Sequence, residues 1–113
     1  MTTEKHKNAI VELTFDFSLA IIEFTEELEH LKKFNLANQL FRCGTSIGAN
    51  VNEAQNAESR NDFIHKMKIS AKETDETIYW LKLCAAAKNY PKPGAFLEKA
   101  IIIQKVLNKI IGT

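Results

Sequence analysis

Apolar residues recur at every third or fourth position along four stretches of this chain, the spacing that gathers side chains on one face of an α-helix. The stretches predicted to be helical are residues 8–31, 36–57, 60–89 and 95–111. The links between them are short, and no stretch has the pattern of a strand. The pattern predicts an all-α protein, an antiparallel up-down-up-down four-helix bundle that forms a single domain over residues 1–113.

The first predicted helix has a second apolar stripe beside the one expected in the core. Its members are Val11, Phe15, Leu19 and Ile22. Left in water, they would form an unusual apolar patch. Either two neighbouring helices of the same chain cover this stripe or another copy of the chain does, and we favour the second interpretation. The predicted oligomer interface also includes two residues from the third predicted helix, Ile69 and Trp80.

The third predicted helix is the longest, and it also has more than one stripe. Its expected core stripe is Phe63, Met67, Ser70, Ala71, Thr74, Ile78, Leu81 and Ala85. Thr77 and Cys84 are expected on the neighbouring stripe, together with Trp80.

Two glycines, Gly44 and Gly48, stand one turn apart inside the second predicted helix. Each costs about 1 kcal/mol relative to alanine in a helix interior. We expect this cost to be offset by the close backbone approach of another helix, as in Gly-x-x-x-Gly pairs. A kink at this point is the competing interpretation.

Polar residues share helix faces in a way that a simple surface helix does not require. Four of them follow one face of the second predicted helix, and three lie on the apolar second stripe of the third. Carboxylates placed there need cationic partners, for which the chain offers Lys66 and Arg42. We interpret the set as a buried polar network that sets helix register, with a ligand site as the alternative. The predicted network is Arg42, Ser46, Asn50, Glu53, Lys66, Glu73 and Glu76.

The residues indicate no catalytic or metal site. A di-metal bundle needs two Glu-x-x-His pairs on facing helices, and only Glu27 to His30 fits that pattern. Cys43 and Cys84 have no histidine at matching helical positions, and we expect them to be buried, reduced thiols. We therefore expect no enzymatic activity, no catalytic residues, no bound metal, no cofactor and no small-molecule substrate.

The net charge of +1 indicates neither nucleic acid nor membrane as a partner, but the charge is unevenly distributed. Acidic residues dominate the first predicted helix, and lysines dominate the last third of the chain. Either the acidic helix lies beside the basic one, or the lysines form a functional surface. The residues predicted to contact nucleic acid in the second case are Lys82, Lys88, Lys92, Lys99, Lys105 and Lys109.

The first eight residues lack the apolar core of a signal peptide. No apolar run approaches the roughly 18 residues needed to cross a bilayer. We expect a cytoplasmic protein without a membrane partner.

Several short motifs resemble one protein family over nearly the whole chain. The motifs are QLFR at 39–42, SIGANVNE at 46–53, SRNDF at 59–63, AKETDET at 71–77 and WL at 80–81. They resemble the four-helix-bundle proteins encoded in intervening sequences of bacterial 23S rRNA genes, often labelled S23-type ribosomal proteins. Many relatives follow the glutamate of the second motif with glycine, whereas this chain has Ala54. That difference predicts that the second helix continues further.

The resemblance implies an antiparallel four-helix bundle assembled as a homopentamer around a central channel. It implies no settled activity, because the ribosomal label reflects gene location. A distant relative, the accessory protein of diversity-generating retroelements, is a basic pentamer that binds a reverse transcriptase and nucleic acid. We therefore expect a non-catalytic, homo-oligomeric interaction or scaffold module. The alternative is an accessory protein that binds RNA or a nucleoprotein through lysines repeated around the ring.

Overall fold

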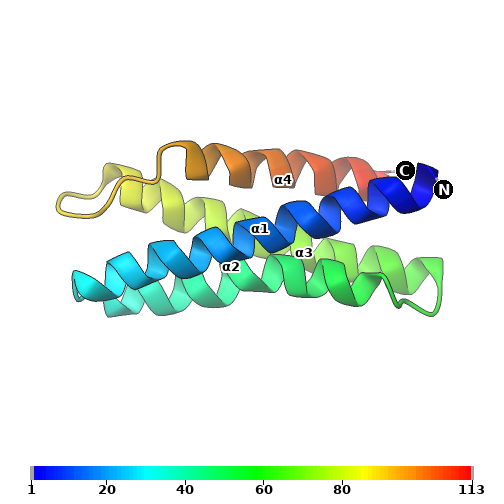
Figure 1. The fold of residues 1–113 in the computed structure, drawn as a ribbon, viewed down its shortest axis with the longest axis horizontal. Coiled ribbons are helices and arrows are strands. Elements are labelled where there is room, and N and C mark those ends of the chain that lie inside the picture. Colours follow the sequence, from blue (N-terminus) through cyan, green and yellow to red (C-terminus); the bar gives the residue numbers. More distant parts are fainter. Residues whose placement is uncertain (1, 113) are drawn as a thin grey trace.

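Four α-helices make up most of the computed structural model, which describes residues 2–112, with side chains from residue 9 onward. They are α1 (Thr2–His30), α2 (Phe34–Ala54), α3 (Arg60–Ala86) and α4 (Ala95–Gly112). Successive helices run in opposite directions, so that the start of α1 and the end of α4 lie at one end of the molecule (Figure 1). The prediction of an all-α four-helix bundle is confirmed.

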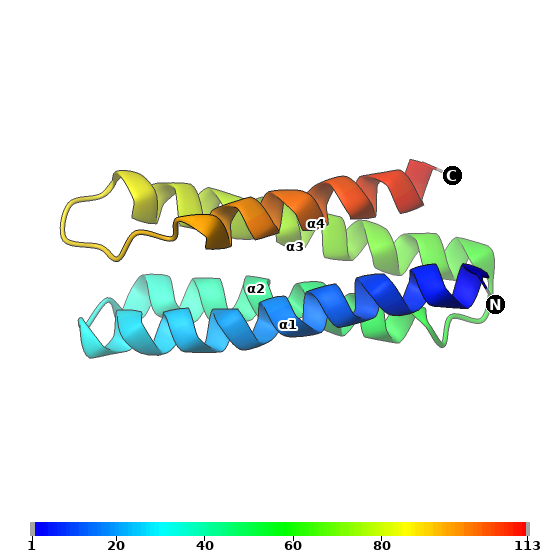
Figure 2. The ribbon, with the colours of Figure 1, turned by 45° about the horizontal axis from the view of Figure 1, so that its top comes forward.

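The helices form a closed cycle in which each packs on its neighbours in sequence and α4 returns to α1. The pair α1–α2 lies beside the pair α3–α4 (Figure 2). The contact between α1 and α4 is the least extensive. Aromatic rings occupy it: Phe96 of α4 stacks on Phe17 at a centroid distance of 4.8 Å and lies 5.5 Å from Phe24. No helix within residues 2–112 is long and apolar enough to span a membrane.

Threonines are buried in the core beside the expected aliphatic residues. The hydroxyl groups of Thr14, Thr25 and Thr74 donate to backbone carbonyl groups one turn earlier, at 2.8, 2.9 and 2.8 Å. Because each hydroxyl is bonded, its burial costs little. On α3 the buried stripe is rotated about the helix axis, relative to the prediction, toward the side that carries Trp80. Thr77 and Cys84 are fully buried, and Ala85 is exposed.

The two glycines of α2 lie against α1. A Cβ atom added to Gly44 would collide with the side chain of Ile21, and one added to Gly48 would lie 3.1 Å from the backbone oxygen of Thr14. The helix continues without interruption through both positions. The predicted close approach is therefore confirmed, and the partner helix is α1.

The links differ in part from the prediction. Helix α2 ends at Ala54 and not at residue 57, because the next three amide groups bond carbonyl groups only three residues back. The expectation that Ala54 lets this helix continue is therefore wrong. Helix α3 begins at a cap in which Ser59 Oγ accepts the backbone N–H of Asp62 at 3.0 Å. It ends at Ala86.

The link between α1 and α2 contains a strained residue. Lys32 has a φ of 62°, in the left-handed region that favours glycine. Its N–H bonds the carbonyl of Glu29 at 2.9 Å, and that of Lys33 bonds the carbonyl of Leu28 at 2.8 Å, the Schellman arrangement that ends α1.

Replacing Lys32 by glycine is expected to raise the free energy of unfolding by about 0.5–1 kcal/mol, because glycine adopts this conformation without steric cost. Urea denaturation followed by circular dichroism measures the change. The matched control is Asn89→Gly, at a φ of 64°, where the gain should be smaller because asparagine tolerates this region. An unchanged or reduced stability of Lys32→Gly would contradict the assignment of strain.

Candidate functional site

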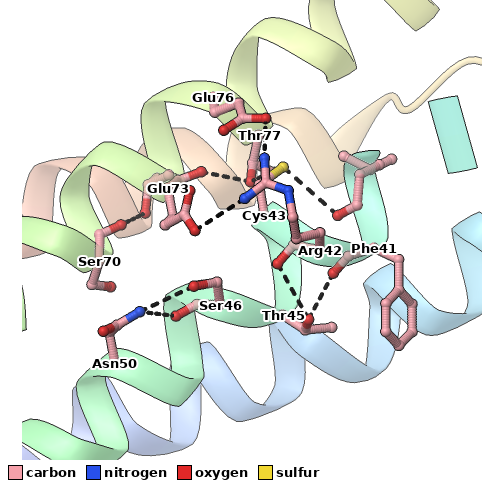
Figure 3. Close-up of polar contacts among 12 residues, drawn as sticks. Phe41, Arg42, Cys43, Thr45, Ser46, Asn50, Ser70, Glu73, Glu76 and Thr77 are labelled. Carbon is pink, nitrogen blue, oxygen red and sulfur yellow. Dashed lines mark hydrogen bonds and ion pairs between the residues drawn. The ribbon is translucent and has the colours of Figure 1, made fainter. Parts of the chain in front are cut away.

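Three charged members of the predicted network, Arg42, Glu73 and Glu76, meet on the surface where α2 and α3 join. Arg42 Nη1 lies 3.4 Å from Glu73 Oε2, and its Nη2 lies 2.5 Å from Glu76 Oε2 (Figure 3). Trp80 Nε1 donates to the same Glu76 oxygen at 3.0 Å. The guanidinium of Arg42 and the indole of Trp80 lower the pKa of Glu76. The side chain of Arg42 remains 53% exposed, so this cluster borders solvent.

The other members form two separate groups. Asn50 Nδ2 donates to the backbone oxygen and the hydroxyl of Ser46 at 2.9 and 3.0 Å, within α2. Lys66 Nζ lies 3.1 Å from Glu53 Oε1, further along the α2–α3 junction. The structure thus places the seven residues in three separate, partly exposed groups, not in the single buried network expected. The charged residues lie at the rim of the helix contact, where long side chains reach water.

Short side chains make the buried polar contacts between α2 and α3 instead. Ser70 Oγ donates to the backbone oxygen of Ile47 at 2.9 Å. Thr77 Oγ1 donates to the backbone oxygen of Glu73 at 2.8 Å and lies 3.2 Å from Cys43 Sγ. A hydroxyl bonded to a carbonyl fits a buried helix contact without an uncompensated charge. Ser70 was expected in the core stripe of α3 and Thr77 on the neighbouring stripe, and the structure shows that both connect α3 to α2.

The low pKa of Glu76 makes a small part of the stability depend on pH. A carboxyl whose folded pKa is depressed adds stability above its unfolded pKa, and that stability is lost as pH falls through the folded pKa. Stability should therefore decline below about pH 4.3, the pKa of an unperturbed glutamate. The decline should be shallower in Glu76→Gln. Urea titrations from pH 3 to 6 measure this decline in the free energy of unfolding.

Equal dependence of stability on pH in the wild type and in Glu76→Gln would contradict the role of Glu76. The matched control is Asp16→Asn, at an exposed site on α1.

These groups form ion pairs and hydrogen bonds within the bundle, and the two thiols are buried. Burial raises the pKa of both the Cys43 and the Cys84 thiols, which makes them poor nucleophiles at neutral pH. Within the part of the chain whose side chains are described, no cluster of three or more histidine, cysteine or carboxylate groups is arranged to hold a metal.

The predicted oligomer interface divides between two faces. On α1, Phe15 is 62% exposed and Leu19 is 49% exposed, Ile22 lies beside them, and Val11 is half-buried. Phe41 of α2, which the sequence interpretation missed, is also exposed and lines a pocket of about 270 Å³ with Ile22. We call this surface the α1–α2 patch, formed by Phe15, Leu19, Ile22 and Phe41.

The other face holds an apolar groove. Ile69 and Trp80 are half-buried on the α2–α3 side, and Trp80 lines a cavity of about 500 Å³ near the start of α2 and the end of α3. We call it the α2–α3 groove. Its lining residues are Asn35, Leu36, Gln39, Trp80, Leu83, Ala86, Ala87 and Tyr90. The stripe of Ile69 and Trp80 was the only sequence signal for it.

The six lysines predicted to contact nucleic acid are all exposed, but their surroundings in the fold differ. Lys92 Nζ donates to the backbone oxygen atoms of Ala87 and Cys84 at 2.6 and 3.3 Å, and so caps the end of α3. Lys99 borders a surface hollow that Glu23 and Glu27 of α1 also line. The acidic helix and the basic helix therefore lie side by side here, as the simpler interpretation of the charge distribution expected.

The chain is similar to a known protein family over most of its length. A family model described as 23S rRNA-intervening sequence protein matches residues 6–109. A solved structure of a protein of unknown function from the S23 ribosomal protein family of Bacteroides thetaiotaomicron VPI-5482 is 35% identical, with a TM-score of 0.89. The match covers 96% of this chain and 99% of that one. Comparison with curated proteins finds no match.

Proposed function

Because this chain belongs to the 23S rRNA-intervening sequence protein family, we propose that it is a non-enzymatic module that assembles with copies of itself and serves as a scaffold for interactions. Neither the family description nor the name of the structural relative states an enzymatic activity. A pentamer is the assembly that the sequence resemblance implies.

The observation that carries the proposal is the α1–α2 patch. Its aromatic and aliphatic side chains lie next to one another on the outside of a bundle whose core is already filled. Burying one such side chain contributes about 1.5–3 kcal/mol relative to leaving it exposed. Patches of this kind mark interaction sites in soluble proteins.

Light scattering on the purified protein at about 50 μM, coupled to size exclusion, tests the proposal. The expected result is a mass that is a multiple of the 12.8 kDa chain, and five copies would support the pentamer. A mass of 12.8 kDa across the accessible concentration range would overturn the proposal.

Binding of RNA through the lysine set is the alternative function. The observation in its favour is that Lys82, Lys88, Lys105 and Lys109 are exposed on α3, α4 and the link between them. Repetition in an oligomer would strengthen their field. A labelled structured RNA is then expected to bind at about 50 mM salt and to bind at least 10-fold more weakly at about 200 mM salt. Fluorescence anisotropy measures this, and no binding at the lower salt would exclude the alternative.

A further inference from the structure

We infer that the α1–α2 patch of one copy seats in the α2–α3 groove of the next copy, so that copies join head to tail through two different surfaces. The inference rests on the proposed self-association and adds which surfaces meet. The interface is then heterologous, because each copy contacts one neighbour through its patch and the other neighbour through its groove.

The positions of the two surfaces support this pairing. Leu36 lines the groove, and its neighbour Ala37 lines the pocket that Ile22 and Phe41 form beside the patch. The pocket beside the patch and the groove therefore flank the start of α2, on different faces. A twofold dimer through either surface would leave the other uncovered, whereas head-to-tail contacts cover both and close into a ring when the rotation allows.

The shapes and chemistry of the two surfaces also match. The patch projects two phenylalanine side chains, Phe15 and Phe41, and the groove is hollow and mainly apolar. The indole N–H of Trp80 is already bonded to Glu76, so the ring can offer an apolar surface to an incoming side chain without losing a hydrogen bond.

Charges around the two surfaces are opposite. Exposed acids flank the patch on α1, among them Glu12, Asp16 and Glu26. At the groove, Lys33 Nζ lies 4.6 Å from the ring centroid of Tyr90, and exposed Lys88 follows Ala87 in the chain. The nearby acids of α3, Glu73 and Glu76, are paired with Arg42. This complementarity favours patch against groove over patch against patch, where like charges would meet.

Mixing two variants, each with one damaged surface, tests the pairing. Leu19→Glu damages the patch and leaves the groove, and Leu83→Glu, at a groove residue that is 41% exposed, does the reverse. Each variant alone should have the mass of a monomer. An equimolar mixture should form a dimer of about twice 12.8 kDa and nothing larger, because the one remaining pair of intact surfaces is then used. Ile102→Glu, at an exposed apolar residue of α4, is the matched control and should assemble like the wild type.

The outcomes separate the two proposals. A monomeric wild-type protein would overturn both. A wild-type oligomer whose variants stay monomeric when mixed would overturn the pairing alone, and so would a Leu83→Glu variant that assembles normally. Circular dichroism checks that each variant keeps its helices. If Leu19→Glu loses them, Phe15→Glu replaces it in the mixture.

Discussion

Replacing Phe15 by glutamate is expected to reduce the protein from an oligomer to a monomer, or to weaken its association by at least 100-fold. The side chain is the most exposed large apolar group of α1 in the single chain, so the substitution should leave the fold intact. In an assembly the new carboxylate would be buried among Leu19 and Ile22 without a partner, which is strongly unfavourable. Light scattering across a dilution series measures the change in mass.

The control for this prediction lies on another helix. Ile102→Glu introduces the same charge at an apolar residue of α4 that is 51% exposed and lies outside both the patch and the groove. Its mass should equal that of the wild type. If both variants dissociate equally, added negative charge and not the patch is responsible. If Phe15→Glu keeps the full mass, the patch is not the interface.

Replacing Gly44 by alanine is expected to lower the free energy of unfolding by about 1–2 kcal/mol. In a helix without neighbours the same change would raise it by about 1 kcal/mol. The added methyl group would lie within 2.7 Å of Ile21 Cγ1, and Ile21 is fully buried, so its side chain has little room to move. Overpacking should therefore outweigh the gain in helix propensity. Urea denaturation measures the sign of the effect.

The matched control for Gly44→Ala is Ala49→Gly, at an exposed position of the same helix. It should cost about 1 kcal/mol, because only helix propensity changes there. A stabilising Gly44→Ala would show that α1 can move away from α2, and would contradict the tight contact at this glycine.

The helices and the close approach at the glycines follow from patterns that a sequence displays directly. Hydrophobic periodicity locates each helix. Two glycines one turn apart predict a close helix–helix contact, because packing must offset the helix stability that they cost. Helix ends are harder to predict. Ala54 would allow α2 to continue, yet the backbone amide groups of the next three residues bond carbonyl groups only three residues back, and the α-helix ends there.

The sites are less predictable than the helices because they depend on which edges of the helices meet. The spacing of Arg42 and Glu53 showed a shared face but not its position at the rim, where the side chains stay in water. The α2–α3 groove needs Tyr90, which the link after α3 brings back to the start of α2. The capping of α3 by Lys92 likewise depends on the path of that link.

The arrangement of the helix ends has a practical consequence. The first turn of α1 and the last turn of α4 lie at one end of a molecule 46 Å long (Figure 1). The groove lies at the other end, beside the start of α2 and the end of α3. A reporter domain or a surface tether joined near residue 2 or residue 112 would therefore stand well away from the groove. If copies join side by side with their long axes parallel, all such attachments would emerge from one rim, and the assembly would display them as a cluster facing in a single direction.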